Sequence, residues 1–236
     1  MPSEEKGKRV FTHFKTVAKR YDFMNTLLSF GIHYAWKRKS IRMLSLEHGD
    51  RVLDLCAGTA DLGLLSAGRV GSSGSVTLYD INRDMMNAGK EKVKRSGFSH
   101  RMAFVQGDAQ CISFPDESFD AAIVGFGIRN LPKPRAGFEE MYRVLRRGGK
   151  MMCLEFSRPS WNLFRCTYDA YSFYVMPFLG ELFAGSRQAY THLPESIRTF
   201  PLPDELSDML REIGFSSVSH HRLTNGIAVI HLAVKT

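Results

Sequence analysis

Residues 51–61 read Arg51-Val52-Leu53-Asp54-Leu55-Cys56-Ala57-Gly58-Thr59-Ala60-Asp61. The apolar run up to Leu55 is short and continuous, which predicts a buried strand, and the small residues after it predict a tight turn. Such a turn lets the backbone approach a ligand closely at the N-terminus of the following helix. It lacks the G-x-G-x-x-G spacing, which counts against a site for a dinucleotide pyrophosphate.

The chain after this turn alternates between strand-like and helix-like patterns. We predict further strands at residues 75–80, 102–105, 119–124 and 151–156, and helices at residues 62–70, 84–95 and 136–145. This alternation predicts an α/β fold, a Rossmann-like doubly wound and mostly parallel sheet with helices on both faces. Right-handed crossovers then bring the carboxyl ends of all five strands to one edge, where ligands bind.

The 236 residues are interpreted as one domain in four parts. Residues 1–45 are basic and predict an N-terminal helical cap, and residues 46–160 form the sheet core. Residues 161–203 are an aromatic-rich helical insertion. Residues 204–236 predict a last helix and two strands, and Asn225-Gly226 between those strands favours an antiparallel hairpin.

The composition is that of an ordinary globular protein with a basic charge. A net charge of +8 suits anionic partners. The basic residues crowd the first fifth of the chain, where a solvated helix face is the simplest explanation and a peripheral membrane contact is the second.

Four scattered cysteines without a C-x-x-C pair argue against a zinc site or a disulfide framework. Without a signal peptide or an apolar run of roughly 18 residues, a cytoplasmic location is expected.

Acidic residues stand at the ends of the first three predicted strands. Asp54 lies in the first strand, Asp80 ends the second, and Asp108-Ala109 follows the third. A carboxylate after the second strand can accept hydrogen bonds from both ribose hydroxyls of an adenosine, and the next acid could meet the exocyclic amine of adenine. This arrangement resembles the class I S-adenosylmethionine-dependent methyltransferases. A simpler role, in which the acids cap helices, stays open.

A closer resemblance covers the chain from about residue 10 to its end. It rests on Tyr21-Asp22-Phe23-Met24-Asn25, Ser29-Phe30-Gly31-Ile32-His33, Trp36-Lys37, Phe126-Gly127-Ile128-Arg129-Asn130, Glu155-Phe156-Ser157-Arg158-Pro159, Tyr168-Asp169-Ala170-Tyr171-Ser172-Phe173, Glu195-Ser196-Ile197-Arg198 and Leu223-Thr224-Asn225-Gly226-Ile227. These segments resemble the ubiquinone/menaquinone biosynthesis C-methyltransferases. The resemblance implies S-adenosylmethionine as cofactor and a polyprenylated quinol, either a demethylmenaquinol or a methoxy-polyprenyl-benzoquinol, as acceptor.

The resemblance also implies which residues contact the cofactor: Asp54, Gly58, Thr59, Asp80, Asp108 and Ala109. Two positions depart from the family's pattern. Ala60 stands where a glycine is usual, so it must adopt a glycine-compatible geometry or the turn must shift. Gly125 replaces a common serine, so one side-chain contact to the cofactor is expected to be lost.

The expected chemistry needs a stabilised phenolate rather than a metal. A ring carbon is a poor nucleophile until the adjacent phenol loses its proton, so a base or a cation would help. We predict that Arg129 stabilises the phenolate, that Asn130 orients it and that Tyr21 closes the pocket. A structural ion pair is the alternative for Arg129. His33 and His192 are weaker candidates for the base.

The acceptor is expected to lie against the insertion. Aromatic residues recur there at helical spacing, and Tyr168, Tyr171 and Phe173 are the expected contacts. Such a face could line a slot for a ring and an isoprenoid tail, or it could simply pack the insertion.

Other functions also stay open. The runner-up is a methyltransferase for a sterol or a phenol, and a non-catalytic cofactor-binding scaffold is a third candidate. A nucleic-acid substrate is disfavoured, because Gly125-Phe126-Gly127-Ile128-Arg129-Asn130 occupies the place of the Asn/Asp-Pro-Pro-aromatic segment of amino-directed enzymes. The sequence leaves open which quinol is methylated and whether the protein forms a homodimer.

Overall fold

The computed structural model describes residues 20–236, apart from the side chains of residues 162–164 and 189. The first 19 residues of the expected N-terminal cap lie outside the described part. The helices are α2 (Tyr21–Ser29), α3 (Ile32–Leu44), α4 (Asp61–Ala67), α5 (Arg83–Arg95), α6 (Pro134–Val144), α7 (Asn162–Ala170), α8 (Met176–Ala184), α9 (Arg187–Thr199) and α10 (Pro203–Ile213). The strands are β1 (Arg51–Leu55), β2 (Ser75–Asp80), β3 (Met102–Gln106), β4 (Phe119–Gly125), β5 (Leu145–Phe156), β6 (Phe215–Leu223) and β7 (Ala228–Lys235). Short helical turns are η2 (Ser99–Arg101), η3 (Ile128–Asn130), η4 (Tyr171–Val175) and η5 (Thr224–Gly226).

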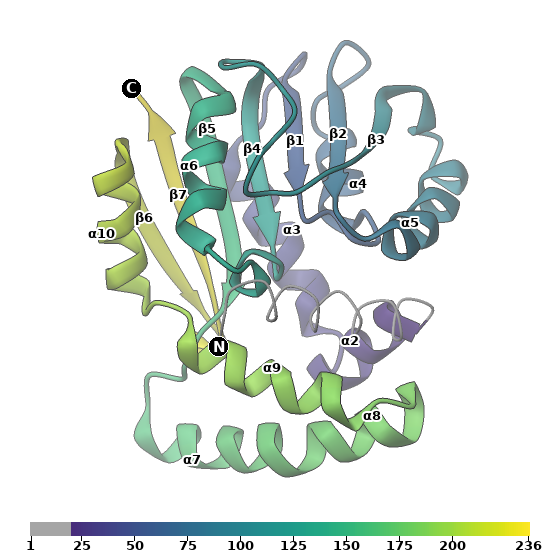
Figure 1. Ribbon diagram of the computed structural model, residues 1–236, viewed down its shortest axis with the longest axis vertical. Coiled ribbons are helices and arrows are strands. Elements are labelled where there is room, and N and C mark those ends of the chain that lie inside the picture. The colour runs from purple at the N-terminus through teal and green to yellow at the C-terminus, as the bar shows by residue number, and fades with distance from the viewer. Residues whose placement is uncertain (1–19) are drawn as a thin grey trace.

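The strands form one sheet in the order β3-β2-β1-β4-β5-β7-β6. Strands β1 to β5 are parallel, and β7 runs antiparallel to both β5 and β6 (Figure 1). The predicted doubly wound, mostly parallel sheet with a C-terminal antiparallel hairpin is therefore confirmed. The strand order reverses at β1 and β4, and the crevice outside such a switch point is where ligands bind.

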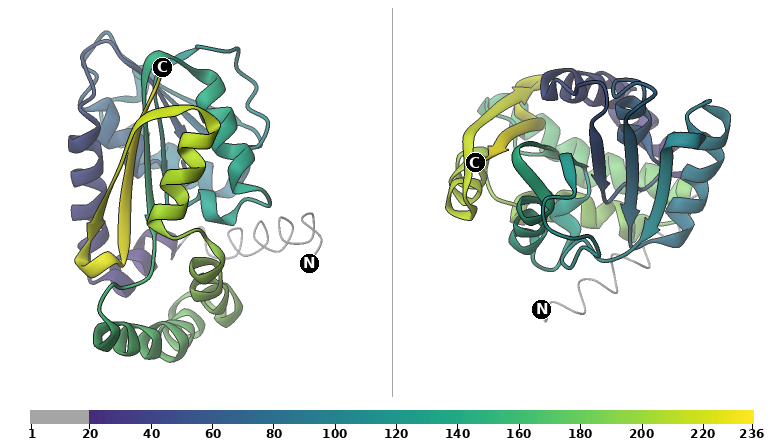
Figure 2. Two further views of the ribbon diagram at one scale, coloured as in Figure 1. Left: turned by 90° about the vertical axis from the view of Figure 1, so that its left-hand side faces the viewer. Right: turned by 90° about the horizontal axis from the view of Figure 1, so that it is seen from above.

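Helices cover both faces of the sheet. Helices α3, α4 and α5 pack on one face, and α6 and α10 pack on the other, as Figure 2 shows. Val52 and Ile123 belong to the core of the first face, whereas Leu53 and Val124 belong to the core of the second. Since side chains alternate along a strand, two buried faces explain why these strands are continuously apolar.

Helices α2, α7, α8 and α9 form a cap beyond the carboxyl ends of the strands (Figures 1 and 2). Helix α8 packs against both α2 and α9. These contacts build a small apolar core of the cap's own: Met24, Leu28, Met176, Ala184 and Tyr190. The N-terminal helix and the insertion, which are far apart in sequence, thus cover the ligand-binding edge together.

Two connections show how turn residues set the element boundaries. Strand β5 begins at Leu145 rather than at Met151, because Gly148, with a φ of +74°, allows a bulge between α6 and the regular part of the strand. In the hairpin, Leu223 pairs with Ala228, and Asn225 between them is left-handed with a φ of +54°. The hairpin that the Asn-Gly pair predicts is confirmed.

Candidate active site

The turn after β1 has a left-handed backbone at alternate residues. The φ angles of Cys56, Gly58 and Ala60 are +55°, +52° and +68°. Ala60 therefore adopts the glycine-compatible geometry, which is the first of the two expected outcomes, and the turn keeps its shape. A left-handed alanine costs about 1–2 kcal/mol, so the surrounding contacts of this buried residue must offset that cost.

Asp80 lies at the end of β2 and faces this turn. Its Oδ2 accepts a hydrogen bond from the Gly58 N–H at 2.8 Å, and its Oδ1 accepts one from the Asn82 N–H at 2.7 Å. Burial raises the pKa of Asp80 above its ordinary value, and these N–H groups oppose the rise. Each carboxylate oxygen can accept two hydrogen bonds, so Asp80 retains capacity for a ligand's hydroxyls.

The two other predicted acids lie in opposite surroundings. Asp54 is 1% exposed, and its Oδ2 accepts the Gly63 N–H at 2.8 Å. Burial raises the pKa of Asp54 to about 8. Asp108 is exposed and accepts a hydrogen bond from the Gln110 N–H, and its neighbour Ala109 is buried. The structure thus brings Asp54, Gly58 and Asp80 together and leaves Asp108 at the open rim.

The space beside Gly125 is already filled. A Cβ atom on Gly125 would lie 2.4 Å from Leu62 Cδ1. Leu62 is buried at the start of α4. The leucine side chain therefore occupies the space that a serine at position 125 would need, and the expected loss of that side chain leaves no hole in the wall.

A network of charges ties the cap to the turn. Thr59 donates its hydroxyl hydrogen to Asp22 Oδ1 at 2.7 Å, and Lys92 Nζ lies 2.9 Å from Asp22 Oδ2. Asp61 pairs with both Lys37 and Lys92. Burial would raise the pKa of Asp61, but the two lysines outweigh it and hold this pKa below its ordinary value. The sequence reasoning missed this network, although Asp22 lies within the first of the family-like segments.

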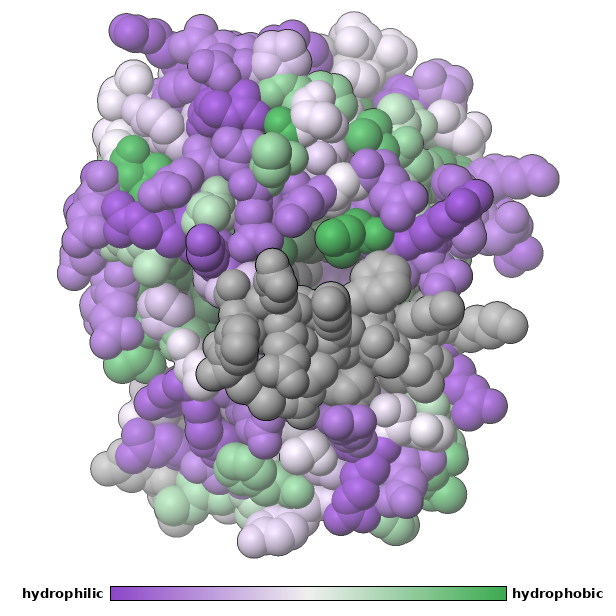
Figure 3. Space-filling model, viewed as in Figure 1, coloured by the Kyte–Doolittle hydropathy of each residue, from purple (hydrophilic) through white to green (hydrophobic). Residues whose placement is uncertain are grey.

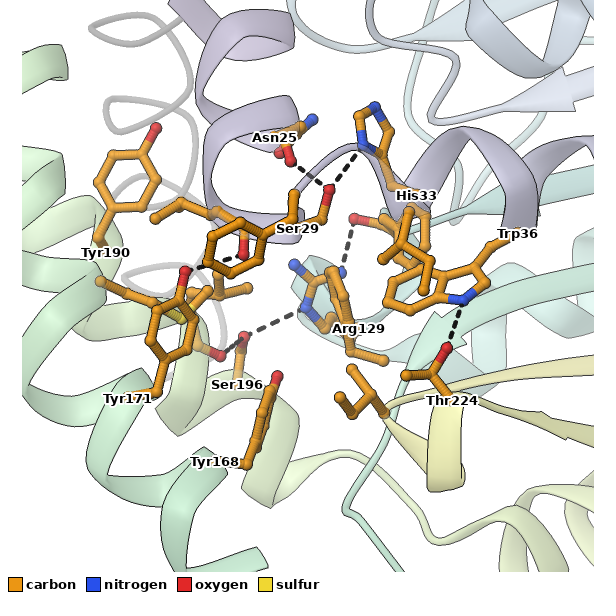
Figure 4. Close-up of a pocket in the computed structure, with 18 of the residues that line it drawn as sticks. Asn25, Ser29, His33, Trp36, Arg129, Tyr168, Tyr171, Tyr190, Ser196 and Thr224 are labelled. Atoms are coloured by element: carbon orange, nitrogen blue, oxygen red, sulfur yellow. Dashed lines mark hydrogen bonds between the residues drawn. The ribbon is translucent and has the colours of Figure 1, made fainter. Parts of the chain in front are cut away.

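A cavity of about 750 Å³ lies between the cap and the sheet edge. Its wall is mostly apolar and aromatic, and polar groups reach it at a few points (Figure 4). The residues that line it are Tyr21, Asn25, Leu28, Ser29, Phe30, Gly31, Ile32, His33, Trp36, Phe126, Arg129, Asn130, Phe156, Thr167, Tyr168, Tyr171, Met176, Tyr190, His192, Leu193, Ser196, Thr224 and Ile227. Its size and lining are those of a small-molecule site.

Arg129 and Asn130 are buried in this wall, on η3. The Arg129 guanidinium lies 2.5 Å from Glu155 Oε1, donates to the Phe126 carbonyl at 2.7 Å and donates to Ser196 Oγ at 3.3 Å. The structural ion pair considered for Arg129 is present, and the same guanidinium lines the cavity. Asn130 is 9% exposed, and its amide nitrogen has no hydrogen-bond partner among residues 20–236.

His33 is buried and held in one tautomer. The Ser29 hydroxyl donates to the Asn25 carbonyl at 2.6 Å, so at 2.8 Å it accepts the Nδ1–H of His33. Burial and the nearby Lys37 lower the pKa of His33 to about 4. The other histidine candidate, His192, also lines the cavity and lies 3.9 Å from Glu195 Oε2.

The predicted acceptor contacts divide into two groups. Tyr168 and Tyr171 line the cavity, and the Tyr171 hydroxyl donates to the Leu28 carbonyl at 2.9 Å. Phe173 does not line it; its ring lies beneath the Arg198 guanidinium at 4.0 Å. The sequence reasoning missed Tyr190 and Trp36 as wall residues, because both come from segments outside the aromatic face of the insertion.

Comparisons with known proteins agree with this site. A model of the ubiE/COQ5 methyltransferase family matches residues 3–235. The ubiquinone/menaquinone biosynthesis C-methyltransferase UbiE of Pseudomonas aeruginosa (strain LESB58) is 42% identical over 100% of this chain and 92% of its own. The demethylmenaquinone methyltransferase of Anoxybacillus flavithermus is 43% identical over 98% of both chains.

A solved structure shows the same fold at low identity. An S-adenosylmethionine-dependent methyltransferase from Aquifex aeolicus superposes with a TM-score of 0.60 at 17% identity, over 85% of this chain and 89% of that one. The fold, the site and these relatives agree. The chain is an S-adenosylmethionine-dependent methyltransferase and belongs to the ubiE/COQ5 methyltransferase family.

Proposed function

We propose that the protein transfers the methyl group of S-adenosylmethionine to a ring carbon of a polyprenylated quinol in respiratory quinone synthesis. The cavity beneath the cap carries this proposal, because its apolar wall contains Arg129 and Asn130 beside the cofactor turn. A quinol joins an apolar ring and tail to two oxygens, so it needs a long apolar wall with few donors. Demethylmenaquinol and methoxy-polyprenyl-benzoquinol are both acceptors that fit this description.

The residues that follow β1, β2 and β3 fit the cofactor. The Asp80 carboxylate has acceptor capacity for the ribose hydroxyls, and we assign the adenine to Asp108 and Ala109. Gly58 and Thr59 would contact the remaining part of S-adenosylmethionine. Asp54 holds the start of α4 beneath them, because its carboxyl group accepts the Gly63 N–H. Bound there, S-adenosylmethionine supplies a sulfonium-activated methyl group.

Arg129 and Asn130 are assigned to the acceptor oxygen. Glu155 and the Phe126 carbonyl fix the guanidinium, so its charge is already in place when the phenolate forms. A preorganised donor of this kind is worth about 3–4 kcal/mol in a buried site. The Asn130 amide nitrogen is a second donor for the same oxygen. The phenol proton passes to water, because the guanidinium of Arg129 has no acceptor atom for it and His33, with a pKa of about 4, is too weak a base to hold it.

Three tyrosines are proposed to hold the ring and the tail. Tyr168 and Tyr171 come from the insertion, and Tyr21 comes from α2 on the other side of the cavity. Because the Tyr171 hydroxyl is occupied by the Leu28 carbonyl, this side chain offers its ring rather than its hydroxyl to a ligand. Such aromatic walls bind a flat ring and an isoprenoid chain through apolar area.

A double variant tests the function and the role of Arg129 together. Arg129→Met alone would leave Glu155 buried without a counter-charge, which costs several kcal/mol, so Arg129→Met/Glu155→Gln removes both charges. The wild type is expected to transfer labelled methyl from S-adenosylmethionine to reduced demethylmenaquinol, to the methoxy-benzoquinol, or to both. The double variant is expected to lose about 100- to 1,000-fold in kcat, with a nearly unchanged KM for the acceptor.

Two results would contradict this assignment. A double variant with the wild-type Tm and the wild-type kcat would leave Arg129 as a structural ion pair. No label on either quinol from a wild type that binds the cofactor would favour a sterol or phenol acceptor, or a scaffold.

A peripheral membrane contact is proposed for the cap. No helix within residues 20–236 is long and apolar enough to cross a membrane. Exposed apolar side chains nevertheless gather on η4 and α8: Phe173, Tyr174, Val175, Phe178, Leu182 and Phe183. In Figure 3, green hydrophobic side chains lie among purple ones along the lower edge of the molecule, over α7 and α8. Side chains of this kind bind at the headgroup boundary, where a tailed quinol is found.

Sedimentation with vesicles of anionic phospholipid tests this contact. Phe178→Ser/Leu182→Ser is expected to lower the bound fraction several-fold, because both side chains are more than half exposed on α8. Leu202→Ser, an exposed leucine before α10, is the control. Equal binding of the wild type and both variants would remove α8 from the membrane contact.

A further inference from the structure

A second, smaller pocket lies next to the acceptor cavity. Its volume is about 220 Å³, and Tyr168 lines both spaces. Its wall includes Ser157 and Arg158 after β5, Asp169 on α7 and Arg198 on α9. Three of the family-like segments therefore meet here, and the chemistry assigned to Arg129 and Asn130 uses none of these four side chains.

The pocket carries more positive than negative charge. Arg158, Arg165 and Arg198 line it, against one carboxylate, that of Asp169. Arg198 pairs with Asp169 at 2.7 Å and stacks on Phe173. Arg158 donates to the Arg198 carbonyl and has no carboxylate partner within residues 20–236. The guanidinium of Arg158 is thus held at the pocket with its charge uncompensated by an ion pair.

A serine hydroxyl belongs to the same wall. Ser157 is 8% exposed and lines the pocket, and its N–H donates to the Ile227 carbonyl, which holds the residue in place. A hydroxyl can donate a hydrogen bond to an anion's oxygen. Ser157 therefore adds a neutral donor to the guanidinium groups of the pocket.

We propose that this pocket binds a phosphate group. Guanidinium forks and a hydroxyl match the oxygens of a phosphate. The volume is below the 300–1,000 Å³ or so of a drug-sized site, which suits one small tetrahedral anion. The same chemistry is offered by free phosphate or pyrophosphate and by the headgroup of a phosphatidate. The pocket's assignment does not depend on which acceptor occupies the larger cavity.

Calorimetric titration of the full chain tests the site with three probes: inorganic phosphate, pyrophosphate and soluble dihexanoyl phosphatidate. At least one probe is expected to bind saturably to the wild type. Arg158→Gln and Ser157→Ala should each weaken that binding, and Arg158→Gln should raise the Kd about tenfold or more, as the loss of a charged hydrogen bond does. Arg187→Gln is the matched control, because Arg187 is exposed on α9, pairs with Glu181 and does not line the pocket.

The pattern of binding also identifies the source of the phosphate. Binding of phosphatidate without binding of either inorganic probe supports a lipid headgroup, and binding of an inorganic probe supports a free anion. A probe-induced rise in Tm that Ser157→Ala reduces separates binding from a purely structural role of Arg158. The proposal is overturned if no probe binds saturably, or if Arg158→Gln binds as tightly as Arg187→Gln.

Discussion

Several residues just after β1 and β4 have strained backbone angles, and the two loops that contain them lie very close together. Cys56, Ala60 and Phe126 are non-glycine residues with φ between +55° and +68°, and such conformations persist only where their surroundings hold them. A Cβ atom on Gly127 would lie 2.4 Å from the Cβ of Cys56, so the Gly127 backbone packs directly against the Cys56 side chain. The family pattern anticipates the geometry of Ala60. Nothing in the residue types Cys and Phe marks a left-handed backbone, so the other two positions could not be predicted.

The buried carboxyl of Asp54 predicts an unusual dependence of stability on pH. Its pKa is about 8 in the folded protein and near 4 in the unfolded chain. Between these values the folded state binds the extra proton, so the contribution of Asp54 to stability is full below about pH 4 and is lost as the pH rises to 8. Asp54→Asn cannot lose this proton. The variant should therefore gain about 1 kcal/mol of unfolding free energy relative to the wild type per pH unit between pH 5 and 8.

Urea unfolding of both proteins at several pH values measures that difference. The comparison removes the contributions of other groups, including His33 and His231, whose lowered pKa values make stability rise with pH below about 6.5. A difference that stays constant from pH 5 to 8 would show that Asp54 is ionised in the folded protein.

Among the secondary-structure elements, helix α2 links the cap to the cofactor turn. Asp22 on α2 accepts from Thr59 and pairs with Lys92 on α5. Sequence patterns predict α5 and the turn, because local periodicity and small residues specify them. They do not predict the pairing, because Asp22 and Lys92 lie 70 positions apart and no local pattern records which surface charges will meet.

Lys92→Met should weaken cofactor binding. Without this lysine, Asp22 and Asp61 lose a shared partner and the turn that carries Thr59 loses a tether. Partly exposed ion pairs are worth about 0.2–1 kcal/mol each, so the Kd for S-adenosylmethionine should rise about threefold to tenfold. Calorimetry at low salt measures it, and the difference should shrink at high salt.

Lys94→Met is the matched control for Lys92→Met. Lys94 lies two residues away on the same helix and is exposed. An equal rise in Kd for both variants would show that the general charge of α5, rather than the tether, governs binding.

At the scale of the whole molecule, the sequence predicts the sheet better than the cap. The five parallel strands and the hairpin are evident from apolar runs and turn residues, and right-handed crossovers bring the carboxyl ends of the parallel strands to one edge. The placement of α2 beside α8 depends on contacts between Met24 or Leu28 and Met176 or Ala184, which no local pattern specifies. For the same reason the sequence singles out Arg129 but not its partner Glu155.

We propose that a quinol ring carbon receives the methyl group in the cavity beneath the cap. The most direct test uses S-adenosylmethionine labelled with carbon-13 in its methyl group, reduced demethylmenaquinol, and carbon NMR of the extracted product. A labelled methyl group bonded to a ring carbon is expected. A labelled methoxy group, or unlabelled quinol recovered from an enzyme that binds the cofactor, would contradict it.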